Sequence, residues 1–459
     1  MEISRRRFLR NCGFAAAGFL GLRKFSDALA GLDLPELENG AGYGPLVMDP
    51  NRIVDLPKGF SYRVISKAGE RMQDGLLVPG KHDGMAAFPG PQGKTILVRN
   101  HEVAPQRIKY SPYGERNHLL KNLANEQLYD PGYRTTPGLG GTTTLVYDTR
   151  SQRLEKHFLS LAGTDRNCSG GATPWNSWIS CEETVTRKEG SIEKDHGYNF
   201  EVPATDQIGL ARPLALKAMG RFNHEAIAVD PRNSIVYQTE DRKDGLIYRY
   251  IPDVPGNLAA GGRLQALAVK GSRGLDTRNW GWGPKISVGQ NFAVEWVDLK
   301  NTDSPSDDLR FQGFARGCAR FASGEGMSYR QGSIFFTCTS GGRAYKGQIW
   351  KLTPSPFEGM PEEKKKPGYL ELFIEAKHPN QFQNADSITI SPTGQVYVCE
   401  DNQTEDHVVG ITPNGGIFKF AKNAMNDSEF AGVVFSPDGS TLFVNIQTPG
   451  LTLAITGKW

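Results

Sequence analysis

A six-residue spacing between a residue that can bind a metal ion and a turn proline recurs along this chain. It is found in Asp83 to Pro89, Cys168 to Pro174, Glu225 to Pro231 and Asp386 to Pro392. Glu325 stands in the same place before Gln331-Gly332, and Ala431 before Pro437. A second short apolar run follows each turn, so each copy predicts a β-hairpin.

The second runs of these hairpins mostly end in polar residues, which are Asn100-His101-Glu102, Glu182-Glu183, Glu240-Asp241, Thr339-Ser340, Glu400-Asp401 and Asn445. A hairpin returns the end of its second strand beside the start of its first, so both sets of polar residues collect on one face. The copies lie at irregular intervals of tens of residues, as in a propeller whose blades carry insertions. We therefore predict an all-β fold, a six-bladed β-propeller with loop insertions between blades, in one domain spanning residues 31–459.

Composition agrees with this fold, because 53 glycines and 28 prolines among 459 residues are typical of a turn-rich β protein. The connections 103–137, 185–216 and 253–307 are predicted to be insertions. We expect the opening strand, residues 59–65, to close the ring by pairing with residues 452–455 of the last hairpin.

The first thirty residues resemble a twin-arginine export signal. Ser4-Arg5-Arg6-Arg7-Phe8-Leu9 precedes an apolar stretch, and Ala28-Leu29-Ala30 suits signal peptidase. Residues 1–30 are therefore predicted to be a twin-arginine signal peptide, with the twin-arginine translocase as partner and a periplasmic or secreted location. This route carries folded proteins, so a cofactor would be inserted before export. The alternative is a basic cytosolic tail.

The charge of the chain argues against nucleic acid as a partner. The net charge of +3 comes from the signal segment, which leaves the remainder near neutrality. No internal run approaches the ~20 apolar residues of a membrane span, so we expect no stable membrane insertion of the mature form, and a monomer. Five cysteines remain after cleavage, and Cys181, Cys338 and Cys399 share one place in their hairpins. We expect these three to be buried and unpaired.

The acidic residues point to a metal centre at the mouth of the propeller channel. If the first strand of each hairpin is innermost, one ring consists of Asp83, Cys168, Glu225, Glu325 and Asp386. A second tier would hold Glu182, Glu240, Glu400 and the triplet ending in Glu102. Crowded carboxylates cannot all ionise without compensating cations. Their oxygens suit Ca²⁺, whereas the thiolate of Cys168 favours a transition metal.

Several motifs resemble the PhoX-type alkaline phosphatase family. They are Gly163-Thr-Asp-Arg-Asn-Cys168-Ser-Gly-Gly-Ala-Thr-Pro-Trp175 with Cys181-Glu-Glu183, Gly220-Arg-Phe-Asn-His-Glu225-Ala, Asn384-Ala-Asp386-Ser-Ile-Thr-Ile-Ser-Pro392, and Phe435-Ser-Pro-Asp-Gly-Ser-Thr-Leu-Phe-Val-Asn-Ile-Gln447. The resemblance runs from about residue 58 to the C-terminus and includes the leader. Its most specific block is Asn-Cys-x-Gly-Gly-x-Thr-Pro-Trp.

The resemblance implies a six-bladed propeller phosphatase that holds two bridged Fe³⁺ ions and two or three Ca²⁺ ions. It implies that Cys168 is an iron ligand and that Glu225 and Glu325 are iron or iron–calcium ligands. The remaining candidate metal ligands or their neighbours are Asp386, Glu182, Glu183, Glu240, Glu400, Asp401, Asp83 and Glu102. The ions would neutralise and align a phosphate monoester and stabilise the charge that develops during its transfer to water.

One position departs from the family pattern. The resemblance implies an arginine two residues before Glu325, and this chain has Ser323 there. The cation that binds phosphate would then be Arg166, Arg221 or Arg343, or it would be absent.

The leading functional hypothesis is an exported, metal-dependent phosphatase acting on small phosphate monoesters, with diesters also possible substrates. Its catalytic candidates are Cys168, Glu225, Glu325, Arg166 and Arg221. One alternative is a calcium-dependent propeller hydrolase such as a lactonase, whose chemistry needs no thiolate. Another is a non-catalytic binding protein braced by calcium. Iron content distinguishes the first hypothesis from the second.

Overall fold

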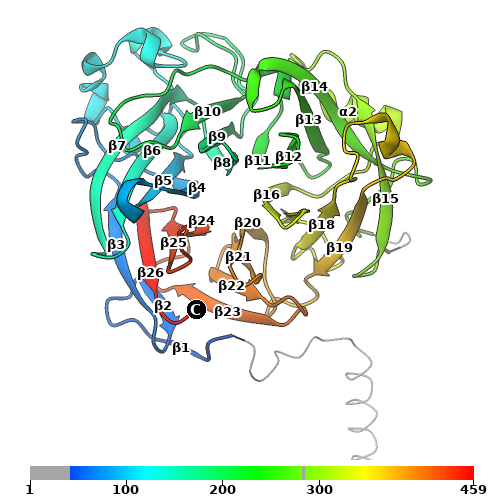
Figure 1. Ribbon diagram of the computed structural model, residues 1–459. Coiled ribbons are helices and arrows are strands. Elements are labelled where there is room, and N and C mark those ends of the chain that lie inside the picture. The colour runs from blue at the N-terminus through cyan, green and yellow to red at the C-terminus, as the bar shows by residue number, and fades with distance from the viewer. Residues whose placement is uncertain (1–41, 282–284) are drawn as a thin grey trace, which may run out of the picture.

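A computed structural model describes residues 42–281 and 285–459 of the protein. The predicted signal peptide, residues 1–30, lies outside the described residues. The described chain forms five antiparallel sheets, arranged around a central axis like the blades of a propeller (Figure 1). The predicted all-β, propeller-like architecture is confirmed.

One strand of each repeat lies against the axis. These six inner strands are β4 (His82–Pro89), β8 (Asn167–Ala172), β11 (His224–Val229), β16 (Gly324–Arg330), β20 (Ala385–Ile390) and β24 (Phe430–Phe435). Each contacts the next, and β24 contacts β4, so the inner strands form a closed ring. Each begins one residue before the recurring position of its repeat, which holds a ligand-type residue in five repeats and Ala431 in the sixth.

The outer strands follow in chain order within each sheet. The first two sheets add β5 (Thr95–His101), β6 (Gly140–Asp148) and β7 (Arg153–Thr164) to β4, and β9 (Ser177–Glu182) and β10 (Asn199–Pro203) to β8. The sheet of β20 adds β21 (Val396–Glu400), β22 (His407–Ile411), β23 (Ile417–Asn423), β2 (Val54–Pro57) and β1 (Leu46–Val47).

The ring is closed by the start of the chain. The last sheet consists of β24, β25 (Thr441–Ile446), β26 (Leu451–Thr456) and the early strand β3 (Ser61–Lys67). Strand β3 pairs antiparallel with β26, from Ser61 opposite Thr456 to Lys67 opposite Leu451. The predicted closure is confirmed, and it gives the first and last parts of the chain one shared sheet.

Two repeats share a single nine-stranded sheet, which differs from the prediction. It contains β11, β12 (Val236–Glu240), β13 (Ile247–Val254), β14 (Asn257–Val269), β15 (Asn291–Asp298), β19 (Tyr369–Glu375), β18 (Gln348–Thr353), β17 (Ser333–Cys338) and β16. Strand β15 joins the two sets because it pairs with β14 on one side and with β19 on the other. Residues 253–307 are therefore not a simple insertion, since they supply these outer strands.

Helical structure in the described residues is confined to connections. The only α-helix there, α2 (Leu309–Arg316), lies between β15 and β16. Five short 3-10 turns occupy the connection after β5: η2 (Ile108–Tyr110), η3 (Glu115–Asn117), η4 (Leu120–Asn122), η5 (Asn125–Gln127) and η6 (Gly132–Arg134). Among the helices of residues 42–281 and 285–459, none is long and apolar enough to cross a membrane.

Apolar side chains fill the space between neighbouring sheets. Trp350, Phe321 and Phe336 are completely buried in one such cluster, where ring edges meet ring faces. The five cysteines of the described chain are free and buried, which confirms the prediction for Cys181, Cys338 and Cys399. Disulfides therefore play no part in holding this region together.

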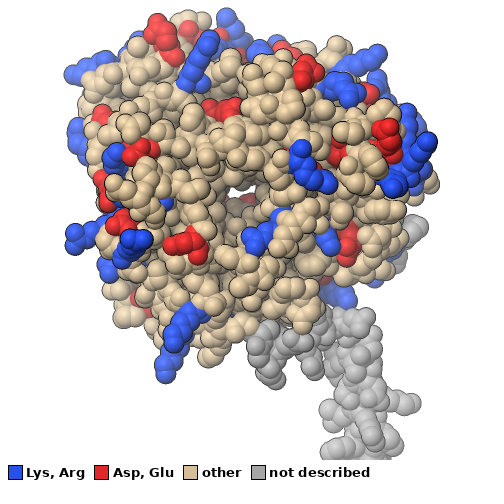
Figure 2. Space-filling model, viewed as in Figure 1, with Lys and Arg blue, Asp and Glu red and all other residues tan. Residues whose placement is uncertain are grey.

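The inner strands approach one another closely because small residues follow the ligand positions. A Cβ atom on Gly84 would lie 2.6 Å from the Cα atom of Ser169, and one on Gly326 would lie 2.6 Å from the carbonyl oxygen of Asp386. Larger side chains would push the inner strands apart. The ring nevertheless leaves an opening at its centre, which Figure 2 shows on one face of the molecule.

Candidate metal centre

Three groups of ligand-type side chains meet at one end of the inner strands. They are Cys168–Glu183–Glu225, Glu225–Glu325–Asp386 and Asp386–Asp401–Glu429. In each group the candidate ligand atoms lie within 4.8 Å of one another. Glu225 belongs to the first two groups and Asp386 to the last two, so the three groups form one continuous row.

A β-bulge at the start of each inner strand aims these side chains. The pairing register shifts between His82 and Met85 of β4, and between the equivalent residues of β8, β11, β16 and β20. In β24 the shift lies one residue later, between Ala431 and Val434. A bulge leaves residues unpaired and turns the strand, which redirects their side chains. We call the residue that directly follows the start of the strand the ligand position, and it holds Asp83, Cys168, Glu225, Glu325, Asp386 and Ala431.

The preceding repeat fixes the backbone at several ligand positions. Asn445 donates a hydrogen bond of 2.6 Å from its side-chain amide to the Asp83 carbonyl. The hydroxyl of Thr239 donates at 2.6 Å to the carbonyl of Glu325, and that of Thr337 at 2.7 Å to the carbonyl of Asp386. The ligand positions are thus held by neighbouring sheets as well as by their own strands.

A second geometry recurs in all six repeats, two residues before each ligand position. The upstream position holds Lys81, Arg166, Asn223, Ser323, Asn384 and Glu429. In all six repeats its carbonyl accepts the backbone N–H of the residue at the end of the second strand, which we call the return position: Glu102, Glu183, Asp241, Thr339, Asp401 and Gln447. Four upstream residues have left-handed backbones, with φ of 49° at Lys81 and Arg166, 50° at Ser323 and 52° at Asn384.

Burial and mutual repulsion disfavour the charged forms of these carboxylates. Burial raises the pKa of Glu225 well above its ordinary value, and Glu183, Asp386 and Asp83 raise it further. The same causes raise the pKa of Glu325 and of Asp386. Burial also raises the pKa of Glu183 to about 8, although Arg166 opposes the rise.

Cys168 adds a soft donor to the end of the row. Burial raises the pKa of its thiol, and the charges of Glu225 and Glu183 raise it further. The Sγ atom lies 3.2 Å from the carbonyl oxygen of His224, which accepts a hydrogen bond from the protonated thiol. A metal ion at this place would reverse the balance, because a coordinated thiol is deprotonated.

The donor set fits polyvalent cations. The row contains one thiol and six carboxyl groups, and Arg166 is the one described cation that forms an ion pair with a member of it. Without metal ions most of these carboxyl groups must take up protons, at a cost in free energy. The thiol end suits a transition metal, and the all-carboxylate end of Asp386, Asp401 and Glu429 suits a hard ion such as Ca²⁺.

Glu182, Glu240 and Glu400 were expected in a second tier of ligands, but they lie outside the three groups. Glu182 is completely buried and accepts hydrogen bonds from the Gly197 backbone at 2.7 Å and the His196 ring at 2.7 Å. Glu240 binds the Leu246 N–H and the Tyr248 hydroxyl, and Glu400 binds the backbones of Gln383 and His407. Each carboxylate holds nearby connecting backbone in place.

The residue after each of these glutamates faces the row, because successive strand residues point in opposite directions. Glu183 and Asp401 are members of the groups, and the charge of Asp241 raises the pKa of Glu183 and of Glu325. Asp241 is therefore a site residue that the sequence analysis passed over in favour of Glu240. Strand alternation counted from the bulge would have identified it.

Glu429 is the second residue that the sequence analysis missed. The last repeat carries Ala431 at the ligand position and so appeared empty. Its acid stands two residues earlier, and burial and the charge of Asp401 raise the pKa of Glu429 well above its ordinary value. The sequence does not mark the upstream position as part of the site, and only the six hydrogen bonds to the return position identify it.

Asp83 and Glu102 lie beside the row rather than within its groups. Gln447 donates to Asp83 at 3.2 Å and to Glu102 at 3.0 Å, and so joins the two acids. Burial raises the pKa of Asp83, and the charges of Glu102 and Asp386 add to this effect. Asp83 therefore interacts electrostatically with the centre.

The three candidate phosphate-binding arginines lie in different surroundings. Arg166 donates to Glu102 at 2.7 Å and to Glu183 in the first group. Arg221 is buried and donates to the backbone carbonyls of His196, Val185, Thr186 and Ser304, so its guanidinium is used in structure. Arg343 is largely exposed and faces Glu375 at 4.0 Å.

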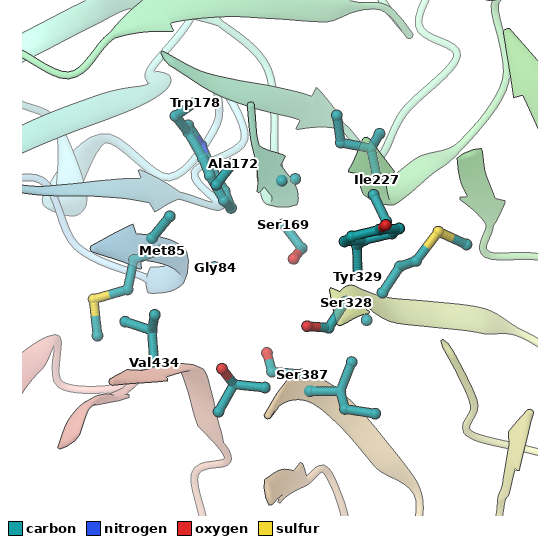
Figure 3. A pocket seen from close by; sticks show the side chains of 18 of the residues that line it. Gly84, Met85, Ser169, Ala172, Trp178, Ile227, Ser328, Tyr329, Ser387 and Val434 are labelled. Carbon is teal, nitrogen blue, oxygen red and sulfur yellow. The ribbon is translucent and has the colours of Figure 1, made fainter. Parts of the chain in front are cut away.

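A cavity of about 360 Å³ continues along the inner strands behind the ligand positions. Its walls begin at Gly84, Ser169 and Ser387, which directly follow Asp83, Cys168 and Asp386 in sequence. Figure 3 shows Ser169, Ser328 and Ser387 around the cavity, together with apolar side chains such as Ile227 and Val434. The centre thus stands at one end of a channel lined by both apolar and small polar side chains.

The described chain resembles known proteins over almost its whole length. The structure of Pseudomonas fluorescens PhoX in complex with vanadate, a transition state analogue, superposes with a TM-score of 0.64 at 16% identity, covering 90% of this chain and 97% of that chain. A gluconolactonase from Xanthomonas campestris gives a TM-score of 0.41 at 12% identity, covering 91% and 99% of the two chains. No curated protein matches significantly. The family model described as alkaline phosphatase PhoX matches residues 41–450, and the chain therefore belongs to the PhoX family.

Proposed function

We propose that this protein is an exported, metal-dependent phosphatase that hydrolyses small phosphate monoesters, with diesters as possible further substrates. One observation carries the proposal: a member of the alkaline phosphatase PhoX family brings seven ligand-type side chains into one row, four from inner strands and three from the connections beside strands. The similar structure from Pseudomonas fluorescens binds vanadate, which its description calls a transition state analogue. We also infer that the six inner strands mark six blades, two of which are joined by β15.

We infer that the row holds iron at its thiol end and calcium at its carboxylate end. Cys168, Glu183 and Glu225 would hold one iron ion, and Glu225, Glu325 and Asp386 a second position next to it. Asp386, Asp401 and Glu429 would hold calcium. When bound, such ions neutralise the ester phosphate and activate water for attack on phosphorus.

The chain's own residues prepare the site for this chemistry. Glu225 and Asp386 are shared between neighbouring groups, so they fix the separation of adjacent positions. Arg166 holds Glu102 and Glu183 in place and offsets part of their charge. Phosphoryl transfer needs positioning and electrostatic stabilisation more than covalent help from the protein, and a preorganised row of carboxylates supplies the first of these.

The thiol of Cys168 argues against two alternatives, namely a calcium-dependent hydrolase such as a lactonase and a non-catalytic binding protein braced by calcium. Neither function needs a soft donor, and Ca²⁺ binds oxygen. Cys168 nevertheless stands at the ligand position with two carboxylates within 4.8 Å. Export by the twin-arginine route, a periplasmic or secreted location and a monomeric state are part of the proposal, and the leader motif in residues 1–30 supports the first two.

Hydrolysis of p-nitrophenyl phosphate at alkaline pH tests the proposal, using protein recovered from its own export route and analysed for iron and calcium. We expect turnover, loss of turnover after chelation, and loss of both iron and turnover in Cys168→Ala. A metal-replete protein that hydrolyses neither mono- nor diesters contradicts the proposal. Calcium without iron, together with lactone hydrolysis, favours the alternative.

A further inference from the structure

The upstream position places two cations at the mouth of the metal centre, in neighbouring repeats. Arg166 precedes Cys168 by two residues, and Lys81 precedes Asp83 by two. Both have φ of 49°, and both accept the N–H of the return residue, Glu183 or Glu102, on their carbonyl. The inner strands that follow them, β8 and β4, are in contact. Lys81 and Arg166 therefore occupy equivalent places directly before two inner strands that contact each other.

The two cations differ in what they already bind. Arg166 forms ion pairs with two carboxylates, Glu102 and Glu183, which offset its positive charge. The ammonium group of Lys81 donates to the side-chain carbonyl of Gln447, a neutral amide. Within the described residues Lys81 has no ion pair at 4.0 Å or less. Its positive charge is thus held at the site without a direct counter-charge.

Lys81 is linked to the metal centre by a hydrogen bond and by its charge. Gln447, which accepts from Lys81, also donates to Asp83 and Glu102 beside the row. The charge of Lys81 also opposes the burial that raises the pKa of Asp401, so it acts on the third ligand group. Lys81 itself is half-buried.

We infer that Lys81 is the cation that binds the phosphate group of the substrate, while Arg166 serves as a counter-charge that positions Glu102 and Glu183. This inference rests on the proposed phosphatase function. A phosphate oxygen can displace the neutral Gln447 carbonyl from the Lys81 ammonium with a gain in charge–charge attraction, because an ionised acceptor binds more strongly than an amide. Displacing Glu102 or Glu183 from Arg166 brings no such gain.

The two other arginines considered for this role, Arg221 and Arg343, are less suited to it. Arg221 is buried and saturated by backbone carbonyls. Arg343 is largely exposed and faces Glu375, which belongs to β19 on the outer side of its sheet. The upstream position of the β16 repeat, where a cation would approach Glu325 most directly, holds Ser323.

The test compares Lys81→Met with Lys94→Met as a matched control. Methionine keeps the length and apolar stem of lysine in both variants. Lys94 lies in the same repeat, directly before β5, and pairs with Glu155 at 2.6 Å at the opposite end of the strand from Glu102. We expect Lys81→Met to raise KM for p-nitrophenyl phosphate and the inhibition constant for inorganic phosphate about 10- to 100-fold. Lys94→Met should change neither.

Two further measurements separate this inference from the proposed function. Elemental analysis should find unchanged metal content in Lys81→Met, and added inorganic phosphate should raise the melting temperature of the parent protein but not of this variant. Lys81→Arg should restore part of the phosphate response.

Normal KM and normal phosphate inhibition in a metal-replete Lys81→Met overturn the inference while leaving the phosphatase intact, and so does loss of metal from that variant. Absence of turnover in the parent protein overturns the proposed function, and the thermal response to phosphate then still tests Lys81.

Discussion

The carboxylates of Glu225 and Asp386 lie within 4.8 Å of each other, although they come from inner strands of different sheets. Glu225 stands in the β-bulge of β11 and Asp386 in that of β20, with Glu325 between them in the ring. Each of the two also belongs to a second ligand group. These two acids therefore link three candidate ion positions into one centre.

This sharing predicts unequal effects of single substitutions on metal content. Glu225→Gln removes a charged donor from two groups, so we expect loss of metal from both and a fall in activity of at least about 100-fold. Asp401→Asn touches only the third group and should reduce calcium while leaving iron in place. Elemental analysis of the purified variants checks this. Equal metal loss in both variants contradicts a row with shared members.

Two adjacent glutamates at the end of β9 should have separable roles. Glu182 is completely buried and pairs with His196, whereas Glu183 belongs to the first ligand group. We expect Glu182→Gln to lower the free energy of unfolding by about 2 kcal/mol or more, since it breaks a buried charged hydrogen bond. Glu183→Gln should instead lower iron content. Chemical denaturation and elemental analysis of both variants distinguish the roles, and the reverse pattern would show that strand alternation had been misjudged.

Glu429 should be a ligand even though the last repeat has alanine at its ligand position. We expect Glu429→Gln to reduce calcium content and to lower activity about 10-fold or more, because the third group would lose one of its three carboxylates. Asp427→Asn is the matched control, since Asp427 is exposed and two residues away in the same connection. Unchanged metal content in Glu429→Gln would remove this residue from the centre.

The spacing in the sequence was sufficient to predict the all-β ring, the closure by β3 and five of the ligand positions. These features depend on local patterns, namely hairpin turns and strand alternation. Glu429, Asp241 and Lys81 were missed because their placement depends on the bulges and on left-handed residues such as Lys81. No residue type in the sequence indicates a bulge here, so the predicted ligands included Glu182, Glu240 and Glu400 as well as Glu183 and Asp401, and only the last two belong to the groups.

The nine-stranded sheet that two repeats share could not be predicted from the sequence pattern either. Strand β15 pairs with β14 and β19, and only the three-dimensional meeting of two outer strands creates this bridge. Segment 253–307 has no ligand-type residue followed by a turn at the recurring spacing, so it was predicted to be an insertion. Its strands pack on the outside of the ring, where the recurring motif gives no information.

The metal-free protein should lose stability as the pH rises. Burial raises the pKa of Glu183 to about 8 from an ordinary value of 4.5, so the folded state binds the proton more tightly than the unfolded state does. The stabilising effect of that proton is present below the unfolded pKa and is lost as the pH passes through the folded value. We expect the melting temperature of the chelated protein to fall between about pH 5 and pH 8, more steeply than that of chelated Glu183→Gln. The metal-replete protein should show a flatter profile, because ions replace the protons as the neutralising charge. A melting temperature of the chelated protein that rises across this range, or that follows the same slope in Glu183→Gln, contradicts the assignment of this glutamate to an acid cluster balanced by cations.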